Sequence, residues 1–491
     1  MPEKEDRVKI AAISLLLCSG AIVSYAQISQ FSHVVVIVQE NRTPDNLFQG
    51  LCAAPYGTPA SCGIGPTDVR LTDHTYDIKT TGWKDKKGTV QPLPIPLADS
   101  YDLGHSHQSF LEMCDKIAGN CKMDGAAGVN CAPRANCPAD PQFRFVDNST
   151  GILNPYLELA TQYGWANYMF QTNQGPSFPA HQFIFGGTSA PSAQDDAKGI
   201  FASENGSTGP VGCAAPNGPP PTPATRVWLI DAAGSETALP PVYPCFEHQT
   251  MTDELPAPLT WRYYAPGPNS IWTAPNAIRH ICVPSVQTGG GTCTGDQWMD
   301  NVDLLPADVL QDIADCNLRS VSWVIPAGYN SDHPNLNDGG GPAWVAAIVN
   351  SIGHSTSCDN NAGYWNNTAV IITWDDWGGW YDHVPPPTPT QPNQRGYQYG
   401  FRVPLIVVSA YTPEHYINNA RHDFGSILRF IEHNFGVEEG DLGFADKRAT
   451  TDLRRFFHLD EKPREFRQIS APVGADFFLN DKRPATDPDT D

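Results

Sequence analysis

The chain has 491 residues and a formal net charge of −22, with 17% charged residues, 42 glycines and 45 prolines. These values indicate a globular protein with a large core and many ordered loops, and they exclude a coiled coil or a disordered chain. A surface this acidic also argues against sequence-independent binding of DNA or RNA, which depends on Lys and Arg at phosphates. It does not exclude a small phosphorylated substrate, because an active site can hold a local cation.

Residues 1–26 have the pattern of an export signal. Arg7 and Lys9 precede the apolar run Ile10–Val23, and Ser24-Tyr25-Ala26 provides small residues for cleavage before Gln27. The run is shorter than the roughly 20 residues of a membrane span. We therefore predict a secreted or periplasmic bacterial protein without a stable membrane span after cleavage; a lipoprotein anchored at Cys18 is the alternative.

Cysteine usage agrees with export. The chain has 13 cysteines, and Cys18 lies within the signal. The remaining even number suits a set of disulfides in an oxidising compartment, with a connectivity that the sequence leaves open. The rival interpretation is a zinc site, but the chain has no C-x-x-C pair.

The predicted elements alternate between strands and helices. In chain order they are strand His33–Val38, helix Asn154–Tyr163, strand Val227–Ile230, helix Ala307–Cys316, strand Val321–Ile325, helix Ala343–Ile352, strands Ala369–Thr373 and Val403–Val408, and helix Asp423–Asn434. Most strands are rich in β-branched residues, which is typical of a parallel sheet covered on both faces. The prediction is an α/β fold, a mostly parallel sheet between helices with long disulfide-stapled loops. We assign residues 27–479 to one domain and 480–491 to a polar tail.

Acidic residues follow two of these strands. Glu40 and Asn41 come after the first, and Asp375 and Asp376 come after Ala369–Thr373. Ligands of open α/β sheets bind at the carboxyl ends of strands, and these oxygen donors suit one divalent cation. Such donors favour Ca²⁺, Mg²⁺ or Mn²⁺ over Zn²⁺. A helix cap or turn is the alternative for the first pair, and an acidic surface turn for the second.

Hydroxyl and imidazole groups supply the other parts of a phosphoryl-transfer site. Ser177 lies in a Gly-Pro-Ser turn, where it is either structural or a nucleophile that a metal activates. His105, His107, His280 and His333 are candidates to hold phosphoryl oxygens or to protonate a leaving alkoxide.

These segments together resemble the bacterial and plant phosphoesterase family that contains phospholipases C and acid phosphatases, within the alkaline-phosphatase-like superfamily. The similar stretches, in the family's order, are HVVVIVQENRTPDNLFQG, GHSHQSF with KMDG, GPSFPAHQFIFGGTS, VSWVIPAGYNSDHP, IITWDDWGGWYDHVPPP, GFRVPLIVVSAYTP and HDFGSILRFIEHNFG. They extend over about residues 31–436, so the resemblance covers most of the chain.

The resemblance implies roles at the matching positions. Glu40, Asn41, Asp375, Asp376 and Ser177 would hold the metal, with Ser177 as the nucleophile. The residues expected to contact the phosphate or assist the leaving group are His105, His280 and His333; His105 is preferred to His107 because family members carry His before Ser or Thr there. Those expected to support the ligands are Asp382 and His383.

The resemblance also implies an exported hydrolase of phosphate esters whose partner is a small phosphorylated substrate or a phospholipid head group. The residues after HNFG are too few for a further β-sandwich of about 100 residues, and position 177 is Ser. Both features favour an acid-phosphatase-type phosphomonoesterase. The alternatives are a phospholipase C, which cleaves a phosphodiester, and a non-catalytic binding protein.

Overall fold

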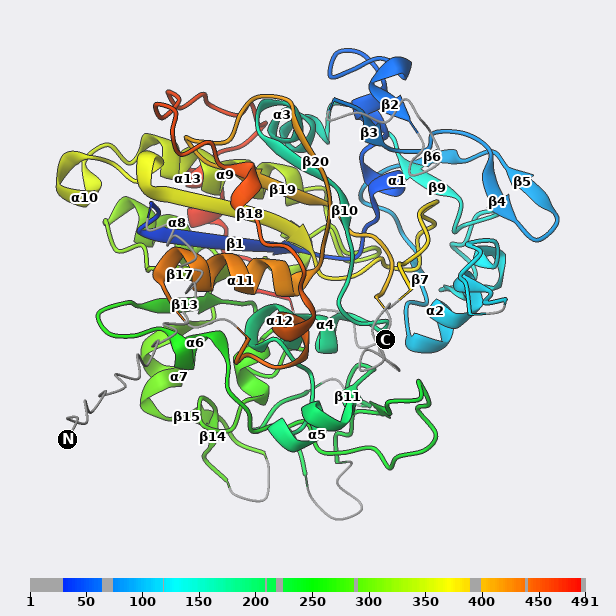
Figure 1. The fold of residues 1–491 in the computed structure, drawn as a ribbon, viewed down its shortest axis with the longest axis horizontal. Coiled ribbons are helices and arrows are strands. Elements are labelled where there is room, and N and C mark those ends of the chain that lie inside the picture. Colours follow the sequence, from blue (N-terminus) through cyan, green and yellow to red (C-terminus); the bar gives the residue numbers. More distant parts are fainter. Residues whose placement is uncertain are drawn as a thin grey trace, which may run out of the picture.

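In the computed structural model, which describes residues 30–63, 74–117, 119–207, 210–217, 224–286, 290–388, 399–437 and 440–486, an eight-stranded sheet runs through the middle of the molecule (Figure 1). Its strands, in spatial order, are β16 (Val302–Asp303), β13 (Trp261–Tyr264), β17 (Val321–Val324), β1 (His33–Gln39), β18 (Thr368–Trp374), β19 (Leu405–Val408), β10 (Gly164–Met169) and β20 (Tyr416–His422). The predicted signal, residues 1–26, lies outside the described ranges.

The sheet is mostly parallel, as predicted. Among the described strands of this sheet, only β19 is antiparallel to its neighbours, pairing in that sense with both β18 and β10. The neighbours β1 and β18 are parallel, and their register sets Gln39 opposite Trp374. The carboxyl ends of β1, β18, β17 and β10 therefore meet at one edge of the sheet.

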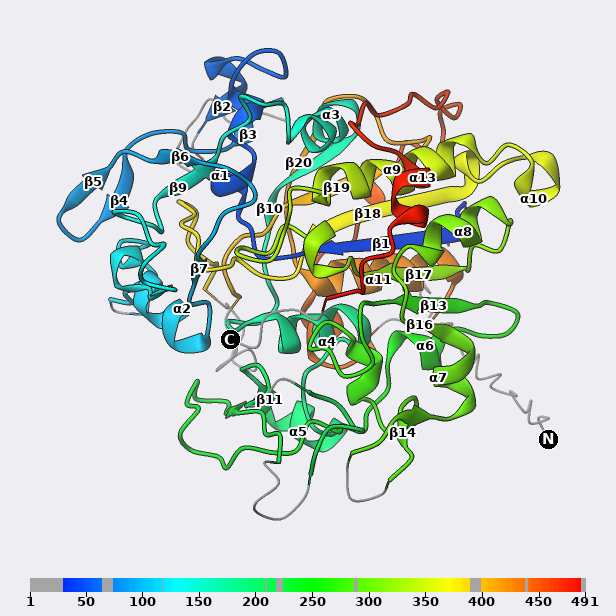
Figure 2. The same ribbon diagram turned by 180° about the vertical axis from the view of Figure 1, so that it is seen from behind.

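Helices cover both faces of the sheet (Figures 1 and 2). On one face α9 (Gly341–His354) packs against α3 (Asn154–Gln162), α8 (Asp308–Ala314) and α13 (Ala475–Asn480); on the other, α11 (Phe424–Phe435) packs against α4 (Ser177–Gly186) and α12 (Phe444–Arg448). The four predicted helices correspond to α3, α8, α9 and α11. Gly436, with φ of 68°, caps α11 in the left-handed conformation that glycine adopts without strain.

One predicted strand does not lie in the central sheet. Within Val227–Ile230 only β12 (Leu229–Ile230) forms, and it pairs with β11 (Phe201–Ala202) instead of joining the central sheet. Trp228 in this run is 46% exposed, so the run is not the strand covered on both faces that its composition suggested.

Short elements occupy the long connections. They are α1 (Pro44–Leu47), β2 (Cys62–Gly63), β3 (Tyr76–Asp77), β4 (Trp83–Asp85), β5 (Gly88–Val90), β6 (Leu93–Ile95), β7 (Asp102–Leu103), α2 (His107–Cys114), β8 (Cys131–Ala132), β9 (Arg144–Val146), α5 (Ala193–Lys198), α6 (Met251–Glu254), β14 (Val283–Pro284), β15 (Cys293–Thr294), α7 (Asp296–Asn301) and α10 (Cys358–Asn361). None of the helices in the described ranges is long and apolar enough to cross a membrane.

Disulfides staple these connections, as predicted. Across the described part of the chain they join Cys52–Cys62, Cys114–Cys121, Cys131–Cys137, Cys213–Cys245, Cys282–Cys293 and Cys316–Cys358. Of the predicted polar tail, the described part contacts the domain: the Arg483 guanidinium pairs with Asp338 at 2.7 Å and lies 3.8 Å from the centre of the Tyr329 ring.

A second, smaller core fastens the first long insertion beside the carboxyl edge of the sheet. Phe110 and Leu103 from the insertion pack with Trp377, Trp380 and Phe401 from the segments around β18 and β19. This packing fixes the segment around residue 105 next to the residues that follow β18.

Candidate active site

The two strand ends come together as the parallel pairing of β1 and β18 requires. Glu40, Asn41, Asp375 and Asp376 are all fully buried, and the Asn41 N–H donates to Asp375 Oδ1 at 3.1 Å. The chain turns sharply at Asn41, whose φ is 60°. Gly378 is needed opposite this turn, because a Cβ there would lie 2.4 Å from the Asn41 carbonyl oxygen.

Ser177 joins this group from another part of the chain. It is the first residue of α4, which follows β10, and its Oγ donates to Asp376 Oδ2 at 3.1 Å. The N-terminal end of a helix favours negative charge, so the position suits an oxygen nucleophile and an anionic phosphate. We call Glu40, Asn41, Asp375, Asp376 and Ser177 the carboxylate cluster.

Two of the predicted histidines border the cluster. His105 Nε2 lies 3.3 Å from Asn41 Nδ2 and 4.0 Å from Asp376 Oδ2, while His105 Nδ1 lies 2.8 Å from the Leu103 carbonyl. Because a carbonyl only accepts, Nδ1 carries a proton. His333 Nδ1 likewise donates to the Pro334 carbonyl at 2.7 Å, and the centres of the His333 and His105 rings are 6.2 Å apart.

A further histidine, which the sequence analysis missed, lies inside the cluster. His181 is fully buried, and its Nε2 is 3.2 Å from Glu40 Oε1 and 3.7 Å from Asp375 Oδ2. Burial lowers the His181 pKa to about 4, although Asp375 opposes the shift, so the ring is neutral at pH 7. The available signal was spacing: His181 is four residues after Ser177 on a helix, which puts both on one face.

The protonation of His181 bears on what the cluster can hold. The Tyr263 hydroxyl donates to the Trp272 carbonyl at 2.8 Å, so it can only accept from His181 Nδ1, 3.4 Å away. Nε2 then presents a lone pair to carboxylate oxygens. This arrangement is repulsive unless a cation lies between them or a carboxylate takes up a proton.

The charges of the cluster lead to the same conclusion. Glu40 Oε2, Asn41 Oδ1 and Asp375 Oδ2 are buried and have no hydrogen-bond partner. Burial and then Asp375 raise the pKa of Glu40 well above its usual value and that of Asp376 to about 8. The residues present therefore fit a divalent cation, which would neutralise the carboxylates and use the unpaired oxygens.

The structure does not bring His280 into this group. Its ring lies between Glu247 (2.7 Å) and Asp253 (3.2 Å), with 30% of the side chain exposed. His248, which lies near His280, packs against Gly186 at the C-terminal end of α4. Ser177 is at the N-terminal end of the same helix. A ten-residue helix is about 15 Å long, so His280 lies away from the nucleophile.

His107 also lies outside the carboxylate cluster. Its Nε2 is 3.2 Å from Gln174 Oε1, its Nδ1 is 3.5 Å from Glu236, and its backbone N–H donates to Glu204 at 2.8 Å. Of the two histidines in this segment, His105 is therefore the one that contacts Asn41 and Asp376.

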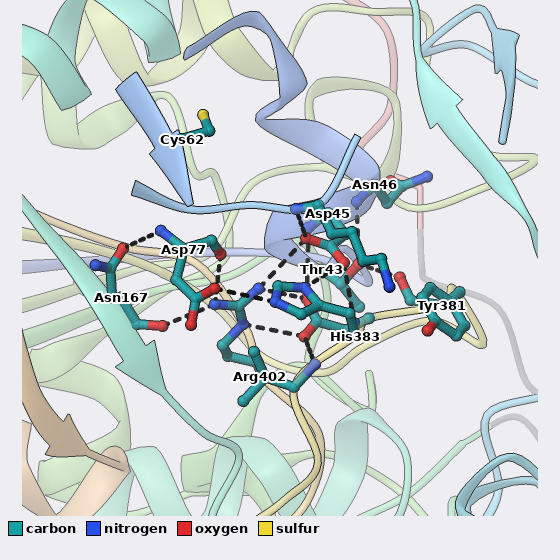
Figure 3. Close-up of polar contacts among 12 residues, drawn as sticks. Thr43, Asp45, Asn46, Cys62, Asp77, Asn167, Tyr381, His383 and Arg402 are labelled. Carbon is teal, nitrogen blue, oxygen red and sulfur yellow. Dashed lines mark hydrogen bonds and ion pairs between the residues drawn. The ribbon is translucent and has the colours of Figure 1, made fainter. Parts of the chain in front are cut away.

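Asp382 and His383 belong to a separate buried group, in which Figure 3 shows His383 beside Asp45, Asp77 and Arg402. His383 Nδ1 lies 2.7 Å from Asp45 Oδ2, and Asp382 accepts from Arg402 at 2.9 and 3.1 Å. None of these contacts reaches the carboxylate cluster, so any support of the metal ligands acts through the intervening chain.

A cavity among the described residues lies away from the carboxylate cluster. It has a volume of about 910 Å³ and is lined by residues including Gln49, Tyr56, Lys79 and Asp147, beside α1. None of the residues of the carboxylate cluster lines this cavity, so the cavity is not part of the candidate site.

Comparison with known proteins indicates the family of the chain. The sequence profile of the Phosphoesterase family matches residues 31–438. "Phospholipase C B" of Mycobacterium tuberculosis is 30% identical over 177 residues, which are 32% of this chain and 33% of that protein. "Non-hemolytic phospholipase C" of Pseudomonas aeruginosa is 26% identical over 184 residues, 32% of this chain and 25% of that protein.

Other matches are longer but more distant. "Hemolytic phospholipase C" of Pseudomonas aeruginosa is 21% identical over 349 residues, 62% of this chain and 42% of that protein. The matched stretches thus span less than half the length of these relatives. A solved structure of an alkaline phosphatase superfamily protein from Vibrio parahaemolyticus aligns with a TM-score of 0.30 and 9% identity over 61% of this chain and 65% of that one, too distant to support an argument.

Proposed function

Because the chain belongs to the Phosphoesterase family, we propose that it is an exported, metal-dependent hydrolase of phosphate esters that uses Ser177 as its nucleophile. The observation that carries the proposal is the contact of Ser177 Oγ with Asp376 Oδ2, within a fully buried cluster of carboxylates. Such a cluster is costly unless it binds a cation, so its presence supports a functional role.

Each residue has a part in the proposed reaction. Ser177 Oγ attacks phosphorus in line as its proton passes to Asp376 Oδ2. The P–O bond to the ester oxygen breaks, and that oxygen takes a proton from His333 or His105 and leaves as an alcohol. Water then cleaves the phosphoserine and restores the hydroxyl. A divalent ion held by Glu40, Asn41, Asp375, Asp376 and Ser177 supplies charge stabilisation for the phosphoryl oxygens.

The donor set bears on the identity of the metal. The proposed ligands are mainly oxygens, which suit Ca²⁺, Mg²⁺ and Mn²⁺. His181 adds a neutral nitrogen donor beside Glu40 and Asp375, and imidazole suits transition metals better than Ca²⁺ or Mg²⁺. We therefore propose Mn²⁺ as the first ion to test, with Zn²⁺ as the comparison.

Two substrate classes are proposed. A phosphomonoesterase of the acid phosphatase type is supported by Ser177 at the nucleophile position, through the family resemblance. A phospholipase C, acting on a phospholipid head group, is supported by the names of the relatives. Assays with p-nitrophenyl phosphate and p-nitrophenyl phosphorylcholine, each with a panel of divalent ions, separate the two; turnover of neither would favour a binding protein.

Substitution of the nucleophile tests the mechanism. Ser177→Ala should lower kcat by at least about a thousandfold, since a nucleophile acts together with its partners and its loss removes the whole pathway. Ser189→Ala is the matched control, because Ser189 is equally buried but donates to the Ala202 carbonyl and not to the cluster. Retention of most activity in Ser177→Ala would contradict the proposal.

Export is the remaining part of the proposal. The six disulfides of the described residues support it, because such bonds persist in oxidising compartments. N-terminal sequencing of protein recovered outside the cytoplasm of a bacterial host should give a start at Gln27. A start at Met1, with the protein retained in the cytoplasm, would contradict it.

A further inference from the structure

Arg402 is a fully buried cation whose donors are all occupied (Figure 3). Its guanidinium forks onto Asp382, with Nε 3.1 Å from Oδ1 and Nη2 2.9 Å from Oδ2. Nη1 donates to the carbonyls of Asp77 (2.8 Å) and Asn167 (2.9 Å), and Nη2 also reaches Asp45 Oδ1 at 3.5 Å. One side chain thus connects residues from β3, α1, β10 and the segment after β18.

His383 provides a second cation in the same group. Its Nδ1 lies 2.7 Å from Asp45 Oδ2 and its Nε2 lies 3.0 Å from Asp77 Oδ1. Carboxylates accept at both nitrogens, so both carry protons. Burial alone would lower the pKa of His383, but Asp45 and Asp77 outweigh it and raise the pKa to about 9. We call Asp45, Asp77, Asp382, His383 and Arg402 the Arg402 network.

This charge balance distinguishes the network from a metal site, although Asp45, Asp382 and His383 lie close enough together to hold an ion. Three carboxylates face two cations. A divalent ion would have to displace the fork of Arg402 or remove a proton from His383. Two of its three negative charges are therefore already balanced by side-chain cations, so the network has little need of a divalent ion.

The network joins the segments that carry the proposed metal ligands. Asp45 is four residues after Asn41, and Asp382 is six residues after Asp376. A further bond links the same two segments, from Thr43 Oγ1 to the Tyr381 carbonyl at 2.9 Å. A shift of Arg402 would thus be transmitted to both ends of the carboxylate cluster.

The network also reaches the segment that carries the nucleophile. The backbone of Arg402 forms an isolated antiparallel β-bridge with that of Phe170. The Gln171 N–H donates to the Phe401 carbonyl at 3.0 Å. From there the chain leads to Ser177, and the Gln171 side chain donates to the Gly175 carbonyl at 3.0 Å.

We propose that Arg402 is a positioning residue which, through Asp382 and the Asp45–His383 pair, fixes the spacing between the metal ligands and the nucleophile. The inference rests on the proposed function. Metal sites need their ligands held to within about 0.5 Å, and loss of the groups that orient ligands typically weakens metal binding or activity by about 10- to 100-fold.

Arg402→Lys is the principal test, because lysine keeps the charge but cannot form the fork. Arg464→Lys is the matched control: Arg464 donates to the carbonyls of Gln162 (2.9 Å) and Thr412 (2.6 Å) and pairs with Glu414 (2.9 Å), near the opposite end of β10. Two readouts are needed, the Mn²⁺ affinity of the metal-free protein by calorimetric titration, and kcat and KM at saturating Mn²⁺.

We expect Arg402→Lys to bind Mn²⁺ about 10- to 100-fold more weakly and to have a kcat reduced by a similar factor with little change in KM, while Arg464→Lys keeps wild-type values. A merely structural role would lower the melting temperature of Arg402→Lys but leave its metal affinity and kcat at wild-type values, which overturns the inference. Equal losses in the Arg464→Lys control overturn it as well.

A milder variant decides the matter if Arg402→Lys does not fold. Asp77→Asn keeps the volume and removes one charge that faces His383; it should weaken Mn²⁺ binding by about tenfold, and unchanged affinity and kcat would overturn the inference. Failure of the proposed function looks different, because the wild-type protein itself would then bind no Mn²⁺ and hydrolyse neither ester.

Discussion

Replacement of Glu40 by Gln should raise the stability of the metal-free protein and lower the gain in stability that metal provides. The substitution keeps the shape of the side chain and removes one buried charge. The ligand atoms of Glu40, His181 and Asp375 all lie within 4.8 Å of one another. Two unit charges at that distance repel by about 3.5 kcal/mol at an effective dielectric constant of 20. Protonation of Glu40, whose pKa burial and Asp375 raise, relieves part of this cost in the wild-type protein.

Metal-free Glu40→Gln should therefore be more stable than the metal-free wild type, by up to about 3 kcal/mol at alkaline pH. For a chain of this length, that difference corresponds to a rise of about 3 °C in Tm. Metal narrows this difference. At a Mn²⁺ concentration of 100 times its Kd, the wild type gains about 2.7 kcal/mol, whereas the variant binds more weakly and gains less.

The assay is thermal unfolding followed by circular dichroism at pH 8.5, with chelator or with Mn²⁺. Glu158→Gln is the control, since Glu158 contacts Gln162 and Ser470, outside the cluster. Its response to Mn²⁺ should match that of the wild type. If Glu40→Gln were destabilised equally with and without metal, the cluster would not be a charge excess that a cation compensates.

Three further predictions concern groups around the site. His280→Asn should leave kcat unchanged but lower the free energy of unfolding by about 1 kcal/mol at pH 6 and not at pH 10. Hydrogen bonds to two carboxylates raise the His280 pKa from 6.5 to about 9, so the stabilisation is lost as pH rises through that range. Urea unfolding at both pH values measures the difference. His105→Asn should lower kcat by about a hundredfold and His107→Asn by much less, as only His105 contacts Asn41 and Asp376; equal losses in steady-state assays would contradict the assignment. Replacement of Cys316 and Cys358 by Ser should lower the free energy of unfolding by about 4 kcal/mol for a crosslink separated by 42 residues, without altering metal affinity; a change below 1 kcal/mol would contradict the chain-entropy argument.

Hydrophobic pattern predicted the strands at the centre of the sheet and missed others. β1, β17 and β18 are runs of β-branched residues, which buried parallel strands favour. β10 (GWANYM) and β20 (YINNARH) have mixed polar and aromatic sequences. The extended conformation of both strands depends on their pairing with each other, a tertiary contact that a local sequence pattern does not show.

The sequence predicted the site residues that directly follow strands better than those on other segments. Glu40 and Asp375 are adjacent because β1 and β18 are parallel neighbours, which the fold class suggested. His181 was missed because Ser177 was interpreted as part of a turn, and the helix that it begins was not predicted. His280 was selected by residue type and resemblance, but its position depends on a long connection whose path no local pattern specifies.

The one antiparallel strand of the described sheet explains how Arg402 comes to lie beside the metal ligands. β19 runs against β18 and β10, so its first residues lie at the edge where those strands end. Arg402 precedes β19 by three residues and is therefore at that edge. If β19 were parallel to β18, its first residue would lie at the opposite end of the strands, about 14 Å away for a strand of four residues. The loop before it could then not reach Asp382 directly. Reversal of this strand thus supplies a buried cation at the end of the sheet where three acidic segments converge.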